Sequence, residues 1–231
     1  MDANPGRERI LERIRAALAA EPPPGRNRGN IPNRDAGLSA SGVFPPIDDS
    51  LARFRAECEA NRTELHLVTA EDEAACLREL VEQERLRAES SADPGAAERR
   101  IFVQDAPELR RLMEKSSAPV RWSAAGPPQA ADFAGLTLAE VLVARTGSVL
   151  ITAFEGGRTA SVLPPVHIVY ARVAQLVSGL GEAIEHVQAS GRVRDVSMLS
   201  LITGPSRTSD IEKMLVLGAH GPRRLAVLLR L

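Results

Sequence analysis

HIVYARVAQLVSGLGEAIEHVQASGRVRDVSMLSLI (167–202) places two short apolar runs on either side of a longer segment with helical periodicity. HIVYA (167–171) and VSMLSLI (196–202) have the length and composition of buried strands, and the residues from Val173 to Ser190 predict a long helix between them. A strand, a helix and a second strand in this order form the unit from which parallel sheets are built. This stretch therefore predicts an α/β fold.

The same alternation continues on both sides of this stretch. It predicts further strands at 65–70, 101–104, 120–122 and 225–231, and helices at 51–60, 71–88, 106–115 and from about Asp210. We expect a layered α/β domain over residues 48–231, with a mostly parallel sheet.

One segment departs from this pattern. VLVARTGSVLIT (141–152) has two apolar runs around Arg145-Thr146-Gly147-Ser148, and Gly147 can supply the positive φ that a tight turn needs. It predicts a β-hairpin inside or beside the parallel sheet.

The first 47 residues differ from the rest of the chain. Residues 1–20 contain an amphipathic helix with an apolar stripe, and residues 21–47 form a Pro/Gly-rich linker or surface strap. The N-terminus lacks the apolar core of a signal peptide, and no apolar run approaches the roughly 20 residues that span a membrane. We therefore expect a soluble, cytoplasmic protein.

Composition excludes several classes of function. The 231 residues include 29 Lys+Arg and 30 Asp+Glu, so the net charge of -1 argues against nucleic acid or an anionic membrane as partner. Aromatic residues make up 3%, too few for a base-stacking surface. Cys58 and Cys76 cannot supply the four thiolates that an iron–sulfur cluster usually needs, and the four histidines lack metal-ligand spacing. We expect no metal and no cofactor in this chain.

Three segments at the ends of apolar runs concentrate small and polar residues, and ligands of open α/β sheets bind at strand ends. The most informative is ITGPSRTSDIE (202–212), in which Gly204 and Pro205 turn the chain. Ser209 and Glu212 have capping-box spacing, so Ser206, Arg207, Thr208 and Asp210 would lie at a helix N-terminus. Such a site suits a phosphate or carboxylate, but a well-capped helix with a solvated arginine explains the residues equally well.

The other two segments are less specific. In 158–167, Arg158, Ser161 and His167 flank a rigid Pro-Pro step, although a lone histidine that opens a strand is more often structural. In 144–148, hydroxyl groups flank a glycine, and a plain hairpin turn explains them nearly as well. His220 belongs to a His-Gly-Pro turn. The nucleotide-binding and serine-hydrolase motifs G-x-G-x-x-G, G-x-x-x-x-G-K-[ST] and G-x-S-x-G do not occur.

Taken together, T-G-S-V-L (146–150), R-T-A-S-V-L-P-P-V-H-I-V (158–169) and ITGPSRTSDIEKMLVLGAHGP (202–222) resemble the LUD-domain family, in particular its lactate-utilisation protein C group. The resemblance covers about residues 50 to 231. It implies a three-layer αβα fold like that of the ribose-5-phosphate isomerase, glucosamine-6-phosphate deaminase and CoA-transferase proteins.

The resemblance also implies a role in the NAD-independent oxidation of L-lactate to pyruvate, with partner proteins that carry the iron–sulfur clusters. The alternatives are a free-standing enzyme acting on a phosphosugar or CoA thioester, and a regulatory module that binds a small carboxylate. The family supplies no catalytic residue to transfer. Its motif positions select ligand-binding candidates at Thr146, Gly147, Ser148, Arg158, Ser161, His167, Gly204, Pro205, Ser206, Arg207, Thr208, Asp210, Glu212 and His220. Arg145 departs from the acidic or small residue that often precedes the Thr-Gly pair. If this position contacts a ligand, we expect either a ligand of different charge or loss of the site.

Overall fold

The computed structural model describes residues 9, 12, 13, 15, 16, 44–90, 99–153, 159–191, 196–209, 215–217 and 221–231. The chain divides into two compact units, 1–46 and 47–231. In the first unit, the described residues of the predicted N-terminal helix are helical and exposed: Arg9, Glu12, Arg13, Arg15 and Ala16. The remainder of that helix and residues 21–43 of the predicted linker lie outside the described residues.

A six-stranded sheet forms the centre of the second unit. Its strand order is β1-β12-β7-β4-β2-β3, and every pairing in it is parallel. The strands are β1 (Glu64–Val68), β2 (Arg100–Val103), β3 (Val120–Trp122), β4 (Asp132–Leu138), β7 (Val166–Arg172) and β12 (Arg224–Arg230). The predicted α/β fold with a mostly parallel central sheet is confirmed.

A second, four-stranded sheet has the order β8-β5-β6-β9. Its strands are β5 (Val141–Val143), β6 (Ser148–Thr152), β8 (Leu176–Val177) and β9 (Leu199–Ile202). β5 and β6 pair antiparallel around a turn in which Gly147 has φ +61°, so the predicted hairpin is confirmed beside the parallel sheet. A Cβ at this glycine would lie 2.8 Å from the Glu57 backbone carbonyl carbon, which fixes the residue type by space as well as by φ.

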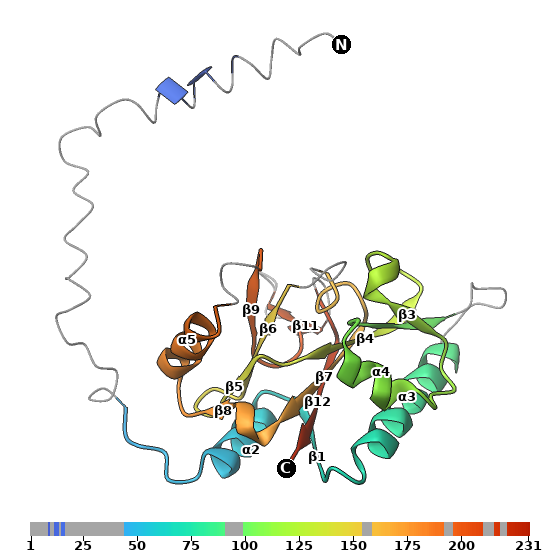
Figure 1. Cartoon of the computed structure of the whole chain (residues 1–231), viewed down its shortest axis with the longest axis horizontal. Helices are drawn as coiled ribbons and strands as arrows, with labels where there is room; N and C mark the ends of the chain where they lie inside the picture. Colours follow the sequence, from blue (N-terminus) through green and yellow to red (C-terminus); the bar gives the residue numbers. More distant parts are fainter. Residues whose placement is uncertain are drawn as a thin grey trace. The chain divides into compact units, whose positions relative to one another are not determined.

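The two faces of the central sheet are covered differently (Figure 1). Helices α3 (Glu73–Ser90) and α4 (Pro107–Met113) pack on one face through residues such as Leu77 and Leu109. The second sheet and helix α2 (Ser50–Ala60) pack on the other face, and α5 (Leu180–Ala189) covers the far side of the second sheet. Burial of apolar side chains on both faces explains why these strands are continuous apolar runs.

Three predicted elements differ from the structure, and one strand of the structure was not predicted. Residues 173–190 form a 3-10 turn (Val173–Gln175), strand β8 and α5 instead of one helix, because Leu176 and Val177 pair with β5. Of 196–202, only β9 is a strand. It lies in the second sheet, where it pairs antiparallel with β6.

The third difference concerns the helix predicted from about Asp210. Arg207–Ser209 is strand β10, which pairs antiparallel with β11 (Leu215–Leu217). Ser209 takes part in this strand pair and Leu215–Leu217 is a strand, so the described residues do not contain the helix predicted from about Asp210. Asp210 and Glu212 lie outside the described residues.

Fourth, the sequence patterns did not distinguish β4, although it is buried along almost its whole length at the centre of the sheet. Gly135 lowers the strand propensity of this segment. The glycine is required here because a Cβ would lie 2.4 Å from the Ala160 carbonyl oxygen.

Among the described residues, no helix combines the length and apolar composition that crossing a bilayer requires.

Candidate functional site

A cavity of about 210 Å³ lies at the amino ends of β7 and β12. It is lined by Ser161, Val162, His167, Leu201, Ile202, Gly204, Pro205, Ser206, Gly221, Pro222 and Leu225. The lining joins segments from three distant parts of the sequence. Ser206 N–H donates to Pro222 O at 2.8 Å, and Arg223 N–H donates to Pro165 O at 2.8 Å. We call it the His167 cavity.

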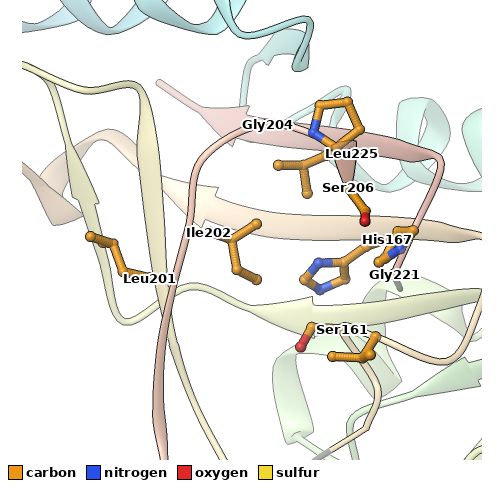
Figure 2. A pocket seen from close by; sticks show the side chains of 11 residues that line it. Ser161, His167, Leu201, Ile202, Gly204, Ser206, Gly221 and Leu225 are labelled. Carbon is orange, nitrogen blue, oxygen red and sulfur yellow. The ribbon is translucent and has the colours of Figure 1, made fainter. Parts of the chain in front are cut away.

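Of the residues that the structure describes in this lining, His167 alone has an ionisable side chain, and it is only 1% exposed. It is the second residue of β7 and is paired in register with Gly135 of β4 and Leu225 of β12. Figure 2 shows its ring between Ser161 and Ser206. Burial lowers the pKa of His167 to about 4, so the imidazole is neutral near pH 7.

The two ring nitrogens have different surroundings. Nε2 lies 2.9 Å from the Thr137 hydroxyl oxygen, and the buried Nδ1 has no hydrogen-bond partner among the residues that the structure describes. Among the described residues, the imidazole is the one hydrogen-bond partner of the Thr137 hydroxyl. If this hydroxyl donates to Nε2, the ring proton is on Nδ1 and only that group lacks a partner. If Nε2–H donates instead, both the hydroxyl proton and Nδ1 lack one. The first arrangement leaves fewer buried polar groups unsatisfied, so the ring proton is assigned to Nδ1.

The remaining lining suits a small molecule with oxygen atoms at one end and an apolar group at the other. Ser161 and Ser206 contribute hydroxyl groups that can donate hydrogen bonds, and Ile202 and Leu225 form an apolar wall. Gly221 keeps the space beside Ser206 open, because a Cβ there would lie 3.1 Å from the serine Cβ. The arrangement can bind a carboxylate or carbonyl oxygen through uncharged donors.

Five predicted site residues meet in this cavity: Ser161, His167, Gly204, Pro205 and Ser206. Their position also corrects an expectation. Segment 158–167 leads into β7 and includes its first two residues. The cavity therefore lies at the amino end of the parallel strands and not at the carboxyl end, where ligands of such sheets are usually found.

The hairpin residues lie elsewhere. Thr146 Oγ1, Ser148 Oγ and Thr203 Oγ1 form a chain of hydroxyl groups, each 2.7 Å from the next. The Asn61 side chain at the end of α2 donates to Thr146 O at 2.9 Å. Thr146, Gly147 and Ser148 therefore connect the hairpin turn to α2 and to the chain after β9.

Arg207 does not line the cavity either. Its guanidinium donates to the backbone oxygen of Asn61, the C-cap residue of α2, so it satisfies a carbonyl at a helix end. The prediction that Arg207 lies at a helix N-terminus is wrong. The side chain of Thr208 and the whole of Arg158, Asp210, Glu212 and His220 lie outside the described residues, and their assignments stay predictions.

Thr137, which determines the proton position on His167, was not among the predicted site residues. In the sequence it is a single polar residue between Leu136 and Leu138. This position becomes informative only once β4 is known to be the neighbour of β7.

Residues 51–229 match the profile of the LUD domain family. The chain belongs to the LUD domain family. The predicted resemblance to that family is therefore confirmed.

Three relatives carry the name Lactate utilization protein C. The protein from Deinococcus radiodurans is 32% identical over 158 residues, which cover 59% of this LUD-domain chain and 74% of the relative. The protein from Shouchella clausii is 37% identical over 90 residues, covering 38% and 39% of the two chains. The protein from Bacillus subtilis is 35% identical over 99 residues and 41% of each chain. The last two alignments span about two fifths of those relatives.

A solved structure shows the same fold. It is a DUF162 family protein from Deinococcus radiodurans, with a TM-score of 0.59 and 22% sequence identity. The match covers 80% of this chain and 99% of the other.

Proposed function

We propose that the protein acts in lactate utilisation, as a subunit of an NAD-independent system that oxidises L-lactate to pyruvate with iron–sulfur partner proteins. Membership of the LUD domain family and the relatives named Lactate utilization protein C support the pathway. The observation that carries the role of this chain is a neutral, buried imidazole with an unpartnered Nδ1 in a small cavity.

The His167 cavity matches the chemistry of L-lactate and pyruvate. Each has a carboxylate, a second oxygen on the neighbouring carbon and one methyl group. The donors of His167, Ser161 and Ser206 would bind the oxygens, and the apolar wall at Ile202 and Leu225 would contact the methyl group. An uncharged donor set binds a small carboxylate without the cost of burying an unpaired cation.

Oxidation of L-lactate releases two electrons and two protons, and the electrons must pass to an acceptor. We assign them to iron–sulfur centres on the partner proteins. Burial raises the pKa of the Cys58 thiol to about 12, which disfavours the thiolate that binds such a cluster. Cys76 packs against the core of α3 and α4. Neither cysteine is therefore a good cluster ligand.

An exposed apolar surface at the cavity supports the assignment of a partner. Val162 and Leu201 line the cavity and are 50% and 44% exposed, and Leu163 and Leu199 beside them are 49% and 41% exposed. Leu199 and Leu201 belong to β9, an edge strand of the second sheet. Exposed apolar residues on an edge strand are typical of a surface that another protein covers.

The test is L-lactate-dependent dye reduction in anoxic extracts of a strain deleted for this chain, with purified protein added back. We expect the wild-type chain and His66→Asn to restore activity and His167→Asn to fail, because His66 is exposed on β1 and lies outside the cavity. Thermal melting of each variant separates loss of the site from loss of the fold. Full activity with folded His167→Asn, or no loss of activity on deletion, would contradict the proposal. Lactate binding to the purified chain without an effect on the extract would favour the carboxylate-binding module.

A further inference from the structure

A second cavity, of about 360 Å³, lies at the opposite end of the central strands. Leu138 ends β4, Gln104 follows β2, and Tyr170 and Arg172 lie at the end of β7. The cavity is therefore at the carboxyl edge of the parallel sheet, where ligands of open α/β sheets generally bind. We call it the carboxyl-end crevice.

Topology places this crevice where the direction of the crossovers changes. β2 continues through α4 to β3 on one side of it, and β4 continues through the β5–β6 hairpin to β7 on the other side. α4 packs on one face of the sheet, and the hairpin packs on the opposite face. The connections after the neighbouring strands β2 and β4 therefore leave the sheet in opposite directions. Such a divergence leaves a crevice at the carboxyl ends of the two strands.

Hydrogen bonds hold the walls of the crevice in place. Leu138 N–H donates to Gln104 Oε1 at 2.8 Å, and Gln104 N–H donates to Leu136 O at 2.9 Å. On the other side, Gln175 Nε2 donates to Ala139 O at 2.5 Å, and its Oε1 accepts from Arg172 N–H at 2.7 Å. Both amide side chains are fixed before any ligand arrives, which lowers the entropic cost of binding.

One ion pair within the protein lies in the crevice. The Arg172 guanidinium donates from Nε and Nη2 to one oxygen of Glu108, Oε1. This pairing makes the crevice a poor site for a phosphate or carboxylate, since the guanidinium is already engaged. In the described part of the chain, Gln104 Nε2 and Glu108 Oε2 take no hydrogen bond. Gln104 directly follows β2, and Glu108 lies in the first turn of α4. One is a donor and the other an acceptor.

We propose that the carboxyl-end crevice binds a vicinal diol, as in a free sugar or the ribose of a nucleoside. Each hydroxyl of a diol both donates and accepts, so neighbouring hydroxyls complement an amide N–H and a carboxylate oxygen side by side. The planar amide and carboxylate groups of Gln104, Glu108 and Gln175 suit a neutral polyhydroxylated ligand. This site is separate from the His167 cavity and does not depend on the proposed role in lactate oxidation.

The test uses the full-length chain labelled with ¹⁵N and four probes: D-ribose, adenosine, 2′,3′-dideoxyadenosine and succinate. We expect ribose or adenosine to shift the amide resonances of Gln104, Leu138 and Gln175. Shifts with ribose indicate a free sugar, and shifts with adenosine alone indicate a nucleoside. Dideoxyadenosine should bind about tenfold more weakly than adenosine, because it lacks the diol.

Variants separate this site from the other cavity. Glu108→Gln should weaken the binding of the diol probe about tenfold. Glu114→Gln, an exposed residue of the same type just after α4, should leave the binding unchanged, and so should His167→Asn. Absence of shifts with both diol probes would overturn the proposal. Equal binding of dideoxyadenosine, or tighter binding of succinate, would also overturn it.

Discussion

The two ends of strand β7 present polar groups in different states. At the amino end, His167 is neutral, and its Nδ1 has no hydrogen-bond partner in the described part of the chain. At the carboxyl end, the Tyr170 hydroxyl donates to Glu73 and the Arg172 guanidinium donates to Glu108. The amino end therefore keeps one buried polar group for a ligand, whereas the carboxyl end uses its charges for internal pairing. Strand β7 therefore offers a ligand-binding group at its amino end, in the His167 cavity, and rigid paired side chains at its carboxyl end, in the carboxyl-end crevice.

The largest expected effect concerns Glu73, which is 2% exposed and lies below the carboxyl-end crevice. Its carboxylate accepts from Tyr170 and from Arg111 at 2.6 Å. We expect Glu73→Ala to lower the free energy of unfolding by about 3 kcal/mol, because the buried Tyr170 hydroxyl loses its charged acceptor. Urea unfolding measures this loss.

Glu71→Ala is the matched control, because Glu71 is exposed two residues earlier. Its expected effect is below about 0.5 kcal/mol. A similar small effect in both variants would show that the Tyr170–Glu73 network does not stabilise the carboxyl end.

The two ends of β7 respond to acid in different ranges of pH. The pKa of His167 is about 4 in the folded chain and ordinarily 6.5, so between these values the unfolded chain binds a proton at His167 and the folded chain does not. The stability contribution is complete above pH 6.5 and is lost as the pH falls to about 4, a change of about 3 kcal/mol. Urea unfolding of the wild-type chain and of His167→Asn at pH 7 and pH 4 should show this change in the difference between them.

Glu73 responds in a lower range of pH. Burial raises its pKa, but the hydrogen bonds from Tyr170 and Arg111 more than offset this and hold the pKa below the ordinary 4.5. Its contribution is therefore present above pH 4.5 and is lost only below it. Loss of stability between pH 6.5 and 5 that persists unchanged in His167→Asn would show that another group titrates there.

A smaller effect is expected at Gly135, which supports the segment before His167. A Cβ there would lie 2.4 Å from the Ala160 backbone oxygen, next to Ser161. We expect Gly135→Ala to destabilise the chain by about 2 kcal/mol through overpacking. Gly181→Ala in α5 is the control, because a Cβ there meets no atom within 4 Å and alanine favours a helix. Thermal melting should shift in opposite directions in the two variants.

Sequence patterns predicted the strands well where apolar runs are buried on both faces. HIVYA (167–171) and LAVLLRL (225–231) correspond to β7 and β12, two neighbours at the centre of the sheet. β4 was missed because Gly135 interrupts its apolar run, and its glycine is required by a contact with residue 160 that no local pattern contains.

The candidate site was predictable in part. The motif segments around Ser161, His167 and Ser206 line the same cavity, although their spacing in the sequence does not show that they are close in space. The helix expected after Arg207 was wrong, since strand pairing with Leu215–Leu217 outweighs a capping pattern. The carboxyl-end crevice had no sequence signal, because its residues come from the ends of three strands, from the 3-10 turn after β7 and from α4 and α5.

We expect His167 to offer an Nδ1–H donor to a small hydroxy or keto acid. The most direct measurement is the ¹⁵N NMR spectrum of the histidine ring in the full-length chain, before and after addition of L-lactate and pyruvate. We predict a neutral ring with the proton on Nδ1, and a shift of that resonance on addition of either acid. In Thr137→Val the preference for this tautomer should weaken, because the hydroxyl that donates to Nε2 is gone. A ring with its proton on Nε2, or an Nδ1 resonance that neither acid moves, would contradict the account.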